Sequence, residues 1–378
     1  MTFAPQTFKQ QLIDWRRELH QNPELSGQEV ATTARIRHWL ESAGLRLLPY
    51  SLATGVVAEV GHGDKVIALR ADIDALPIQE TSGVSFSSQH DGVMHACGHD
   101  VHSSVILGAA LLLKEREDQL AGRVRLLFQP AEENFTGAKA LIKAGALENV
   151  SAIFGMHNEP GLPIGTFATR GGAFYANVDR FVLRVKGKGA HAARPHEGHD
   201  PIVLASQLVI ALQTIASRDI DTLDSVVVSV TRIQGGNTWN VLPENVELEG
   251  TVRTHRGDIQ KQVEKRIREI ASGLASAFGA QIDVEWFNGP VTLINDEKWA
   301  AFSMQVAQSV GYKTQTSELH MGGEDFAVYL QTIPGAFVSI GSASPYGLHH
   351  SAFNPDEALI ENAARYFATL AEKALLQN

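Results

Sequence analysis

VIALRADID, residues 66–74, is the stretch that decides how this sequence is expected to fold. Its first four residues form an apolar run, and charged residues, among them Asp72 and Asp74, come directly afterwards. The same change occurs in VRLLFQPAEE at 124–133 and in AIFGMH at 152–157. Short apolar runs of this kind are typical of buried strands in an α/β sheet, which binds ligands beyond the carboxyl ends of its strands. We therefore expect the polar residues that follow the runs to meet in one crevice.

Segments with helical periodicity separate these runs. Phe8, Leu12, Trp15 and Leu19 recur every three or four residues, and a helical pattern also covers about 101–114. The alternation of helices with buried strands predicts an α/β domain whose central sheet is mostly parallel. The same pattern returns late in the chain, as a helix near 297–310, an apolar strand at 336–340 and a closing helix at about 356–376. Both ends of the chain are therefore expected to build one domain.

The order of elements changes between these two parts. Asp200 and Pro201 are typical of a helix N-cap and of the first helical position. Around this helix the sequence predicts strands at 180–186, 225–233, 244–253 and 281–286 and a second helix at 258–278. The resulting order, β-α-β-β-α-β, is that of a ferredoxin-like unit. We expect this inserted domain at 179–289 and a discontinuous α/β domain at 1–178 and 290–378.

Composition limits the partners and the compartment. The 32 basic and 42 acidic side chains leave a formal charge of −10, without the basic face that nucleic acid or an anionic membrane requires. The longest apolar stretch, 105–113, is far shorter than the roughly 20 residues of a membrane span, and the N-terminus lacks an apolar signal core. A single cysteine excludes an internal disulfide and fits a reducing compartment. The expectation is a cytoplasmic protein that binds neither nucleic acid nor membrane.

MHACGHDVH at 94–102 places Cys97 and His99 two residues apart, just before a predicted helix. A thiolate and an imidazole together suit Zn, Mn, Co or Ni better than Mg or Ca. With no second cysteine, a closed structural zinc site is not expected. A buried thiol beside a helix-capping histidine explains this segment equally well by itself. Glu133 and His157 follow two of the apolar runs, and they favour metal binding.

The adjacent carboxylates Glu132 and Glu133 suggest divided labour. One can bind a metal ion, while its neighbour accepts a proton from water whose pKa the metal lowers to about 7. The alternative is an acidic helix N-terminus, where glutamate is favoured electrostatically. Cys97 as a nucleophile activated by His99 or His157 is a further alternative. The sequence has no G-x-S-x-G, H-E-x-x-H, Walker or G-x-G-x-x-G motif.

Longer motifs follow one another along nearly the whole chain. They are WRRELHQNPELSGQE (15–29), LRADIDALPIQE (69–80), MHACGHDVH (94–102), QPAEE (129–133), GMHNEP (155–160), GKGAHAARPHEGHDPI (187–202), GGNTWNVLPENVELEGTVRT (235–254), MGGEDFA (321–327) and GLHHSAFNPDE (347–357). In these motifs and their order the sequence resembles the M20 family of metallopeptidases and amidohydrolases, in particular its aminoacylase-like branch. That branch includes hippurate hydrolases, auxin-conjugate hydrolases, N-acetyl-diaminopimelate deacetylases and some carboxypeptidases.

The resemblance implies a catalytic α/β domain that carries two divalent ions, Mn, Zn, Co or Ni, and an inserted ferredoxin-like lid. The implied ligands are Cys97 as a bridge between the ions, His99, Glu133, His157 and His349. The family's usual proline two residues after the last histidine is replaced here by Ser351, and His350 is the neighbouring alternative.

The resemblance also implies roles for residues that bind no metal. Glu132 matches the general base, and Asp72 matches a residue that holds a ligand histidine, with a strand-end cap as the alternative. His191 matches a lid histidine that reaches the substrate or the developing oxyanion, often from a neighbouring subunit. Asn240 and Arg253 are candidate substrate-binding residues or structural residues of the lid.

The activity implied is hydrolysis of the amide bond of an N-acyl amino acid with an acetyl, benzoyl or aryl-acyl group. The products are a carboxylic acid and a free amino acid. A dipeptidase or carboxypeptidase that uses the same site is the alternative, and an inactive binding protein with the same fold is a third reading. By analogy, exposed strand edges of the lid predict a homodimer.

Overall fold

The apolar runs form the centre of an eight-stranded sheet with the order β1-β2-β4-β3-β5-β16-β6-β15. The structure is a computed structural model that describes residues 5–377. The strands of this sheet are β1 (Arg46–Leu47), β2 (Val56–Gly61), β3 (Val66–Asp72), β4 (Arg123–Gln129), β5 (Val150–Glu159), β6 (Thr166–Thr169), β15 (Lys313–Thr316) and β16 (Gly335–Gly341). The four central strands β4, β3, β5 and β16 are parallel, and antiparallel pairs occur only towards the edges. The predicted α/β fold with a mostly parallel sheet is confirmed.

Two strands are longer than the apolar runs that predicted them. Asp72 is the last residue of β3, and His157 lies inside β5, two residues before its end. Both were expected just beyond their strands, and that placement was wrong. The strands continue because β3 pairs with β4 up to Asp72 and β5 pairs with β16 beyond His157. Backbone pairing, which the apolar pattern does not report, therefore extends the sheet into the polar region.

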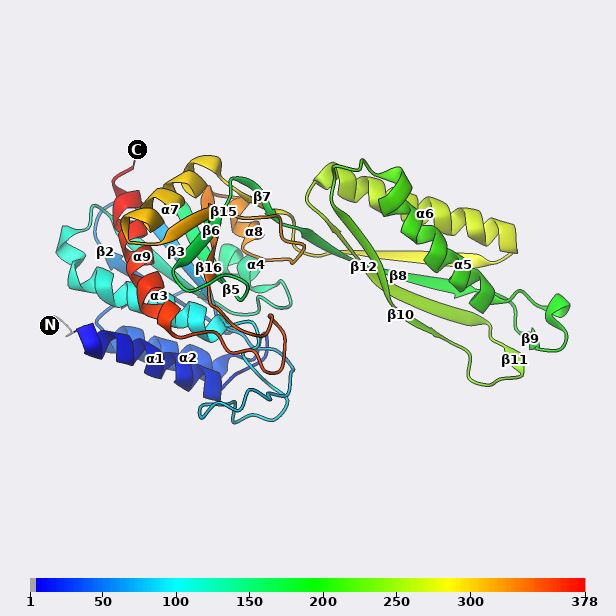
Figure 1. Cartoon of the computed structure of the whole chain (residues 1–378), viewed down its shortest axis with the longest axis horizontal. Coiled ribbons are helices and arrows are strands. Elements are labelled where there is room, and N and C mark those ends of the chain that lie inside the picture. The colour runs from blue at the N-terminus through cyan, green and yellow to red at the C-terminus, as the bar shows by residue number, and fades with distance from the viewer. Residues whose placement is uncertain (1–4, 378) are drawn as a thin grey trace. The chain divides into compact units, whose positions relative to one another are not determined.

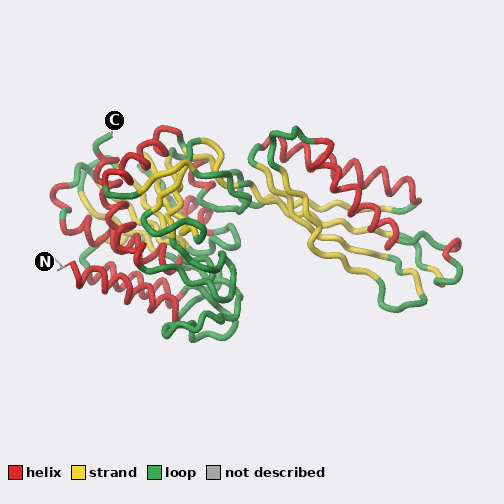
Figure 2. Tube along the Cα trace, in the orientation of Figure 1, coloured by secondary structure: helices red, strands yellow, loops and turns green. Residues whose placement is uncertain are grey.

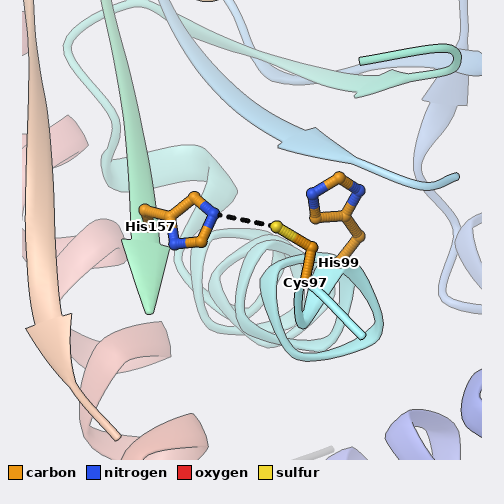
Figure 3. A group of neighbouring side chains, drawn as sticks. All are labelled: Cys97, His99 and His157. Atoms are coloured by element: carbon orange, nitrogen blue, oxygen red, sulfur yellow. Dashed lines mark hydrogen bonds between the residues drawn. The ribbon is translucent and has the colours of Figure 1, made fainter. Parts of the chain in front are cut away.

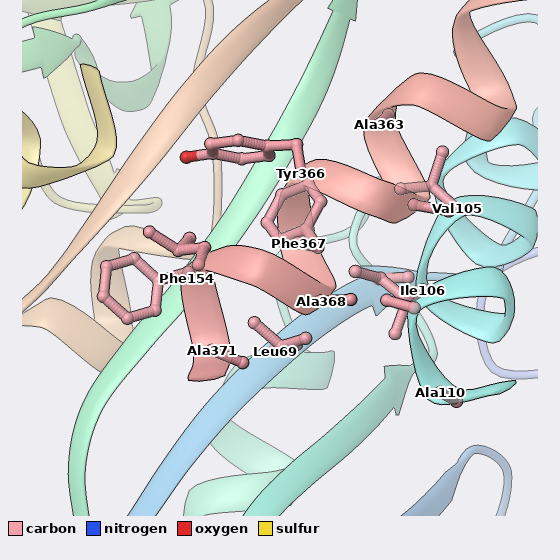
Figure 4. Close-up of a cluster of buried hydrophobic side chains, with 14 of the residues drawn as sticks. Leu69, Val105, Ile106, Ala110, Phe154, Ala363, Tyr366, Phe367, Ala368 and Ala371 are labelled. Atoms are coloured by element: carbon pink, nitrogen blue, oxygen red, sulfur yellow. The ribbon is translucent and has the colours of Figure 1, made fainter. Parts of the chain in front are cut away.

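Helices cover both faces of this sheet. The helices are α1 (Pro5–Gln21), α2 (Val30–Ser42), α3 (His99–Glu115), α4 (Gly137–Lys143), α7 (Glu297–Ser309), α8 (Ala327–Leu330) and α9 (Ala358–Leu375). In the main core, Leu69 and Phe154 of the sheet pack against Ile106 of α3 and Phe367 of α9 (Figure 4). The next residue of β5, Gly155, faces the opposite side and touches Phe326 at the start of α8. The α3–α9 layer therefore supports the strands from one side and leaves their carboxyl ends to the loops.

The inserted segment forms a second, antiparallel sheet with the order β10-β12-β8-β13. Its strands are β8 (Asn177–Lys186), β10 (Val226–Gly235), β12 (Asn245–Thr254) and β13 (Gln281–Asn288), and its helices are α5 (Pro201–Thr214) and α6 (Gly257–Phe278). Both helices lie on the same face of this sheet (Figures 1 and 2). The side chain of Asp200 caps α5 by accepting from the N–H of Ile202, and Pro201 takes the first helical position. The element order is β-α-β-β-α-β, as the sequence predicts.

The chain divides into two units. The main unit comprises Met1–Gly172, Ile294–Glu318 and Asp325–Asn378, and the lid unit comprises Ala173–Leu293 and Leu319–Glu324. Between its sheet strands the lid unit also contains β9 (Ala190–His191) and β11 (Val241–Leu242), which pair with each other. The remaining short strands, β7 (Gly172–Tyr175) and β14 (Leu293–Asn295), have no counterpart in the elements predicted from the sequence.

One helical segment, Pro201–Asp219, is long and apolar enough to cross a membrane by length and composition alone. A single segment of this kind is weak support for a membrane span. Leu204, Leu208 and Leu212 of this segment are fully buried and pack in the core of the lid unit. Packing against the lid sheet accounts for the apolar residues on the buried face of this segment.

Candidate metal centre

The loop before α3 brings a thiol and an imidazole to the carboxyl end of the main sheet. Cys97 precedes Gly98, and His99 is the first residue of α3. Gly98 has φ +89°, and a Cβ atom there would lie 2.3 Å from the Nδ2 of Asn158. That Nδ2 donates to the carbonyl oxygen of Cys97 at 2.7 Å. A glycine is therefore needed for the turn that presents Cys97 and His99 beside β5.

Cys97, His99 and His157 converge from two elements (Figure 3). The Sγ of Cys97 lies 3.3 Å from the Nε2 of His157, which projects from β5. One ligand atom from each of the three side chains lies within 4.8 Å of the others, and all three residues are buried. A thiolate and two imidazoles at this spacing are a donor set for a borderline-soft divalent ion.

Glu133 and His349 extend this group. The Oε1 of Glu133 lies 3.5 Å from the Nε2 of His349 and 3.9 Å from the Nε2 of His99. Cys97, Glu133 and His349 form a second set of ligand atoms within 4.8 Å of one another. The structure thus brings all five predicted ligands together around Cys97, whose sulfur belongs to both sets.

His349, and not His350, faces this group. His349 has φ +63°, and its N–H donates to the carbonyl oxygen of Ala96, which ties the late loop to the segment before Cys97. The ring of His350 instead stacks on Tyr346 at 4.5 Å, and its Nδ1 accepts from the N–H of Ala352. Both of these contacts keep the His350 ring within its own loop.

Hydrogen bonds select the tautomers of the two buried histidines. The Nδ1 of His157 donates to the carbonyl oxygen of Asn158 at 2.8 Å. Because a neutral imidazole carries one proton, the Nε2 of His157 keeps its lone pair and turns it towards Cys97. The Nδ1 of His99 is likewise paired with Asp74, at 3.1 Å, which leaves Nε2 as the ligand atom. Histidines held by their second nitrogen are characteristic of metal sites.

The electrostatics of the group fit a cation. Burial alone would lower the pKa of His99, but Asp72, Asp74 and Glu133 raise it to about 10. Burial, with Glu133 and Glu132, raises the pKa of the Cys97 thiol well above its usual value. The buried Nε2 of His99 and Oε1 of Glu133 have no hydrogen-bond partner within the described chain. Divalent ions would bind these two atoms, which make no hydrogen bond, and would balance the negative charge around them, so the residues fit the metal centre.

Glu132 is buried beside the ligand group. One ligand atom of Glu132 lies within 4.8 Å of a carboxylate oxygen of Glu133 and of a ring nitrogen of His99. The backbone N–H of Asp325 donates to the Oε1 of Glu132 at 3.3 Å. The MGGEDFA motif, to which the sequence assigned no step, therefore supplies a contact that orients this carboxylate.

Asp74 and Asp72 both lie against the ligand histidine His99. Asp74 binds the Nδ1 of His99, and its Oδ2 accepts from the N–H of Glu133 at 3.0 Å. Asp72 lies 3.5 Å from the other ring nitrogen of His99 and is hydrogen-bonded to His102 and to Arg70, each at 2.7 Å. Sequence reasoning noted Asp74 after the strand but gave it no role. The available signal for a role of Asp74 was its position two residues after Asp72.

The lid residues separate into two places within the lid unit. His191 lies opposite Val241 in the β9–β11 pair, and the carbonyl oxygen of Asn240 accepts from the N–H of Ala192 at 3.1 Å. His191 and Asn240 are therefore neighbours. Arg253 lies opposite Val178, at the far end of β8 from this pair. The structure brings His191 and Asn240 together and does not bring Arg253 to them.

Comparison with known proteins gives consistent matches over the length of the chain. The family model described as peptidase family M20/M25/M40 matches residues 68–373. An N-acetylcysteine deacetylase of Bacillus subtilis (strain 168) is 47% identical over 371 residues, which cover 97% of this chain and 98% of that protein. A thermostable carboxypeptidase of Saccharolobus solfataricus is 37% identical over 374 residues, 96% of this chain and 95% of its own.

Solved structures agree with the sequence comparison. The crystal structure of a dinuclear metal-binding peptidase of family M20 from Bacillus subtilis has a TM-score of 0.89 and 44% identity to this chain. The match covers 99% of this chain and 100% of that one. Its described dinuclear centre and the two overlapping ligand sets around Cys97 both support a site for two divalent ions. The chain belongs to peptidase family M20/M25/M40, as a metal-dependent amidohydrolase of that family.

Proposed function

We propose that the protein hydrolyses the amide bond of N-acyl amino acids at the group of Cys97, His99, Glu133, His157 and His349, with Glu132 as general base. The observation that carries this proposal is the placement of a buried carboxylate, Glu132, beside five potential ligands, two of whose buried ligand atoms make no hydrogen bond within the described chain. The products are a carboxylic acid and a free amino acid. A binding protein would not need an additional carboxylate at this position.

Two divalent ions, when bound, polarise the substrate carbonyl and make a water molecule acidic enough to lose a proton near neutral pH. The chain's own contribution is to fix their ligands. Asn158 and Asp74 orient His157 and His99, and Asp74 also holds the backbone of Glu133. This support lets the ligands keep one arrangement while the substrate binds and leaves.

Glu132 moves the proton in this scheme. It accepts a proton from the attacking water as the new C–O bond forms at the amide carbon. It then delivers that proton to the amide nitrogen as the C–N bond breaks, so the amino acid leaves as an amine. The N–H of Asp325 donates to one oxygen of this carboxylate and thereby orients it.

His191 is proposed to stabilise the oxyanion of the tetrahedral intermediate. The N–H of Ala193 donates to its Nδ1 at 3.1 Å, so a neutral His191 carries its proton on Nε2. The side chain is exposed, and its Nε2–H is a suitable donor to developing negative charge. Asn240, fixed beside it, is proposed to bind the substrate together with it.

We propose that His191 acts on the active site of a partner subunit. Arg253, the other lid candidate, is opposite Val178, and the intervening strand up to Lys186 spans roughly 25 Å. One lid therefore cannot place Arg253 and His191 on the same amino-acid derivative. Two lids in a symmetric dimer can, with Arg253 from one chain and His191 from the other.

The lid unit offers surfaces for such a dimer. β10 is an edge strand of its sheet, with one row of backbone groups unpaired by the described chain. Beside it, α5 exposes Ile202, Val203 and Ile210, the last at 64%. An apolar face next to an open strand edge is unfavourable in water. We therefore propose that a second copy of the chain covers both.

The similarity to a deacetylase of N-acetylcysteine favours an N-acetyl amino acid as substrate, and the similarity to a carboxypeptidase keeps peptides as the alternative. The test is to measure kcat/KM on acetyl-, benzoyl- and indoleacetyl-amino acids and on free dipeptides, with enzyme of known metal content. We expect the acyl amino acids to be cleaved faster and chelation to abolish cleavage. Faster turnover of dipeptides would establish the alternative.

The ion is proposed to be Mn, Zn, Co or Ni, because one ligand is a thiolate and three are imidazoles. We propose a cytoplasmic location because the chain has one cysteine, which is buried and forms no disulfide. Reconstitution of metal-free protein with each ion in turn, followed by activity measurement, tests the choice of metal.

A further inference from the structure

The N-terminal motif PELSGQE, residues 23–29, contains a buried carboxylate that the proposed mechanism does not use. Glu29 is fully buried. It occupies the N-cap position of α2, yet its side chain makes no capping hydrogen bond. Glu24 caps this helix instead, by accepting from the N–H groups of Ala31 and Thr32 at 3.1 and 2.7 Å. Something other than helix capping therefore occupies the carboxylate of Glu29.

Glu29 binds the turn that carries the proposed general base. Its Oε1 accepts from the backbone N–H of Ala131 at 2.8 Å, across 102 residues of sequence. The same oxygen accepts from the N–H of Gly27, and Oε2 accepts from the hydroxyl of Thr54, each at 2.8 Å. Three donors converge on one buried carboxylate, which fixes its position and the position of Ala131.

Ala131 has a backbone conformation that needs such support. Its φ of +53° lies in the left-handed region, which is unfavourable for a residue with a Cβ atom. Its carbonyl oxygen accepts from the N–H groups of Thr136 and Gly137, so the residue is held at both ends. Glu132 and Glu133 follow directly, and the direction in which they leave the turn depends on this residue.

A second carboxylate fixes the same turn one step further on. Asp74 accepts from the N–H of Glu133, and the hydroxyl of Ser26 donates to the same oxygen of Asp74 at 2.7 Å. The segment before α2 therefore binds both carboxylates. Ser26 donates to Asp74, and Gly27 donates to Glu29. Asp74 secures the metal-ligand side of the turn at Glu133, and Glu29 secures the side that leads into Glu132.

We infer that Glu29 is a positioning residue for Glu132: its carboxylate holds Ala131 in the left-handed conformation that directs the base at the substrate. This inference rests on the proposed role of Glu132. Loss of Glu29 lets the turn relax, and misplacement of a catalytic group by about 1 Å can cost 100-fold in rate. The metal ligands keep their own support from Asp74 and Asn158.

The test compares Glu29→Ala with Glu29→Gln and with Glu24→Ala. We expect Glu29→Ala to lower kcat about 10- to 100-fold, with KM and bound metal unchanged. Glu29→Gln should recover most of the activity, because its amide oxygen can accept from Gly27 and Ala131 while its NH₂ group donates to Thr54. Glu24→Ala removes the cap of α2 without touching the turn, and should lower thermal stability while leaving kcat unchanged.

Three results would overturn the inference: a normal kcat in Glu29→Ala, equal impairment of Glu29→Gln, or loss of metal from Glu29→Ala. Should Glu29→Ala fail to fold, Glu29→Asp gives the same test, since it keeps the charge and withdraws the acceptor by one methylene. Full activity of Glu132→Gln would refute the proposed function itself. An inactive Glu132→Gln with a normal Glu29→Ala would refute only the role of Glu29.

Discussion

At the scale of single residues, Cys97 shows how surroundings decide between two chemistries. Burial and the neighbouring glutamates raise the pKa of its thiol, so without a cation it stays protonated. A protonated thiol is a poor nucleophile, whereas divalent ions would deprotonate it and use the thiolate as a ligand. Its position in both ligand sets favours the bridging role.

Replacement of Cys97 distinguishes these roles. We expect Cys97→Ala to lose bound metal, from two ions per chain to one or none, because the shared ligand is gone. Activity should fall with metal content, as measured by elemental analysis of the dialysed protein. A variant that keeps both ions and still loses all turnover would instead identify Cys97 as a nucleophile.

At the scale of elements, α3 is fastened to α1 by a buried ionic cluster behind the metal centre. The Nε of Arg16 and the Nδ1 of His20 both lie 2.8 Å from the Oδ2 of Asp100, in the first turn of α3. Burial would raise the pKa of Asp100, but Arg16 and His20 hold it well below its usual range. This cluster steadies the helix whose first residue is His99.

Removal of Arg16 tests how much α3 depends on the cluster. Arg16→Met removes the guanidinium that pairs with the buried carboxylate of Asp100. It should lower the free energy of unfolding by roughly 3–5 kcal/mol. The matched control is Lys265→Met, which removes an exposed i,i+4 pair with Glu269 and should leave the free energy of unfolding almost unchanged. Urea unfolding of the metal-free variants measures both. Equal, small effects would show that the cluster contributes little.

Elements with strong local signals were predictable from the sequence, and the others were not. The Asp200–Pro201 start of α5 follows from local chemistry, and the central strands follow from their apolar runs. β6 and β15 escaped prediction because they are four residues long, and most of β15 is exposed. Their pairing comes from contact between distant segments, which leaves no local pattern.

The metal centre divides in the same way. Glu133 and His157 were nominated by residue type next to predicted strand ends, and Cys97 and His99 by their spacing just before a predicted helix, whereas His349 needed the family motif. Asp72 was predicted to hold a ligand histidine; the structure places Asp74 at the Nδ1 of His99 and Asp72 3.5 Å from its Nε2. Two carboxylates two residues apart cannot be told apart by pattern, because the turn after β3 decides which one faces the ring.

At the scale of the whole molecule, the proposed dimer would build each active site from two chains. His191 and Asn240 lie together at one end of the lid unit, and Arg253 lies at the other. The open edge of β10 and the apolar face of α5 lie on the same unit. Catalysis and dimer formation are therefore expected to fail together.

Complementation between two inactive variants tests this arrangement. Glu132→Gln and His191→Ala should each be nearly inactive alone. In co-expressed mixed dimers, one of the two sites combines an intact Glu132 with an intact His191, so about a quarter of the sites should recover in a random mixture. The control is Glu132→Gln co-expressed with a variant that carries both Glu132→Gln and His191→Ala. This mixture should stay inactive. Absence of recovery in purified mixed dimers would place His191 in the same chain as its active site.

The central claim is that Glu132 transfers the proton at the metal centre and is not itself a metal ligand. The most direct measurement is of turnover and metal content together in Glu132→Gln. The substitution keeps the size of the side chain and removes its basicity, so kcat on the best N-acyl amino acid should fall about 10²–10⁴-fold with two ions still bound. Turnover at the wild-type level in the metal-loaded variant would contradict the account.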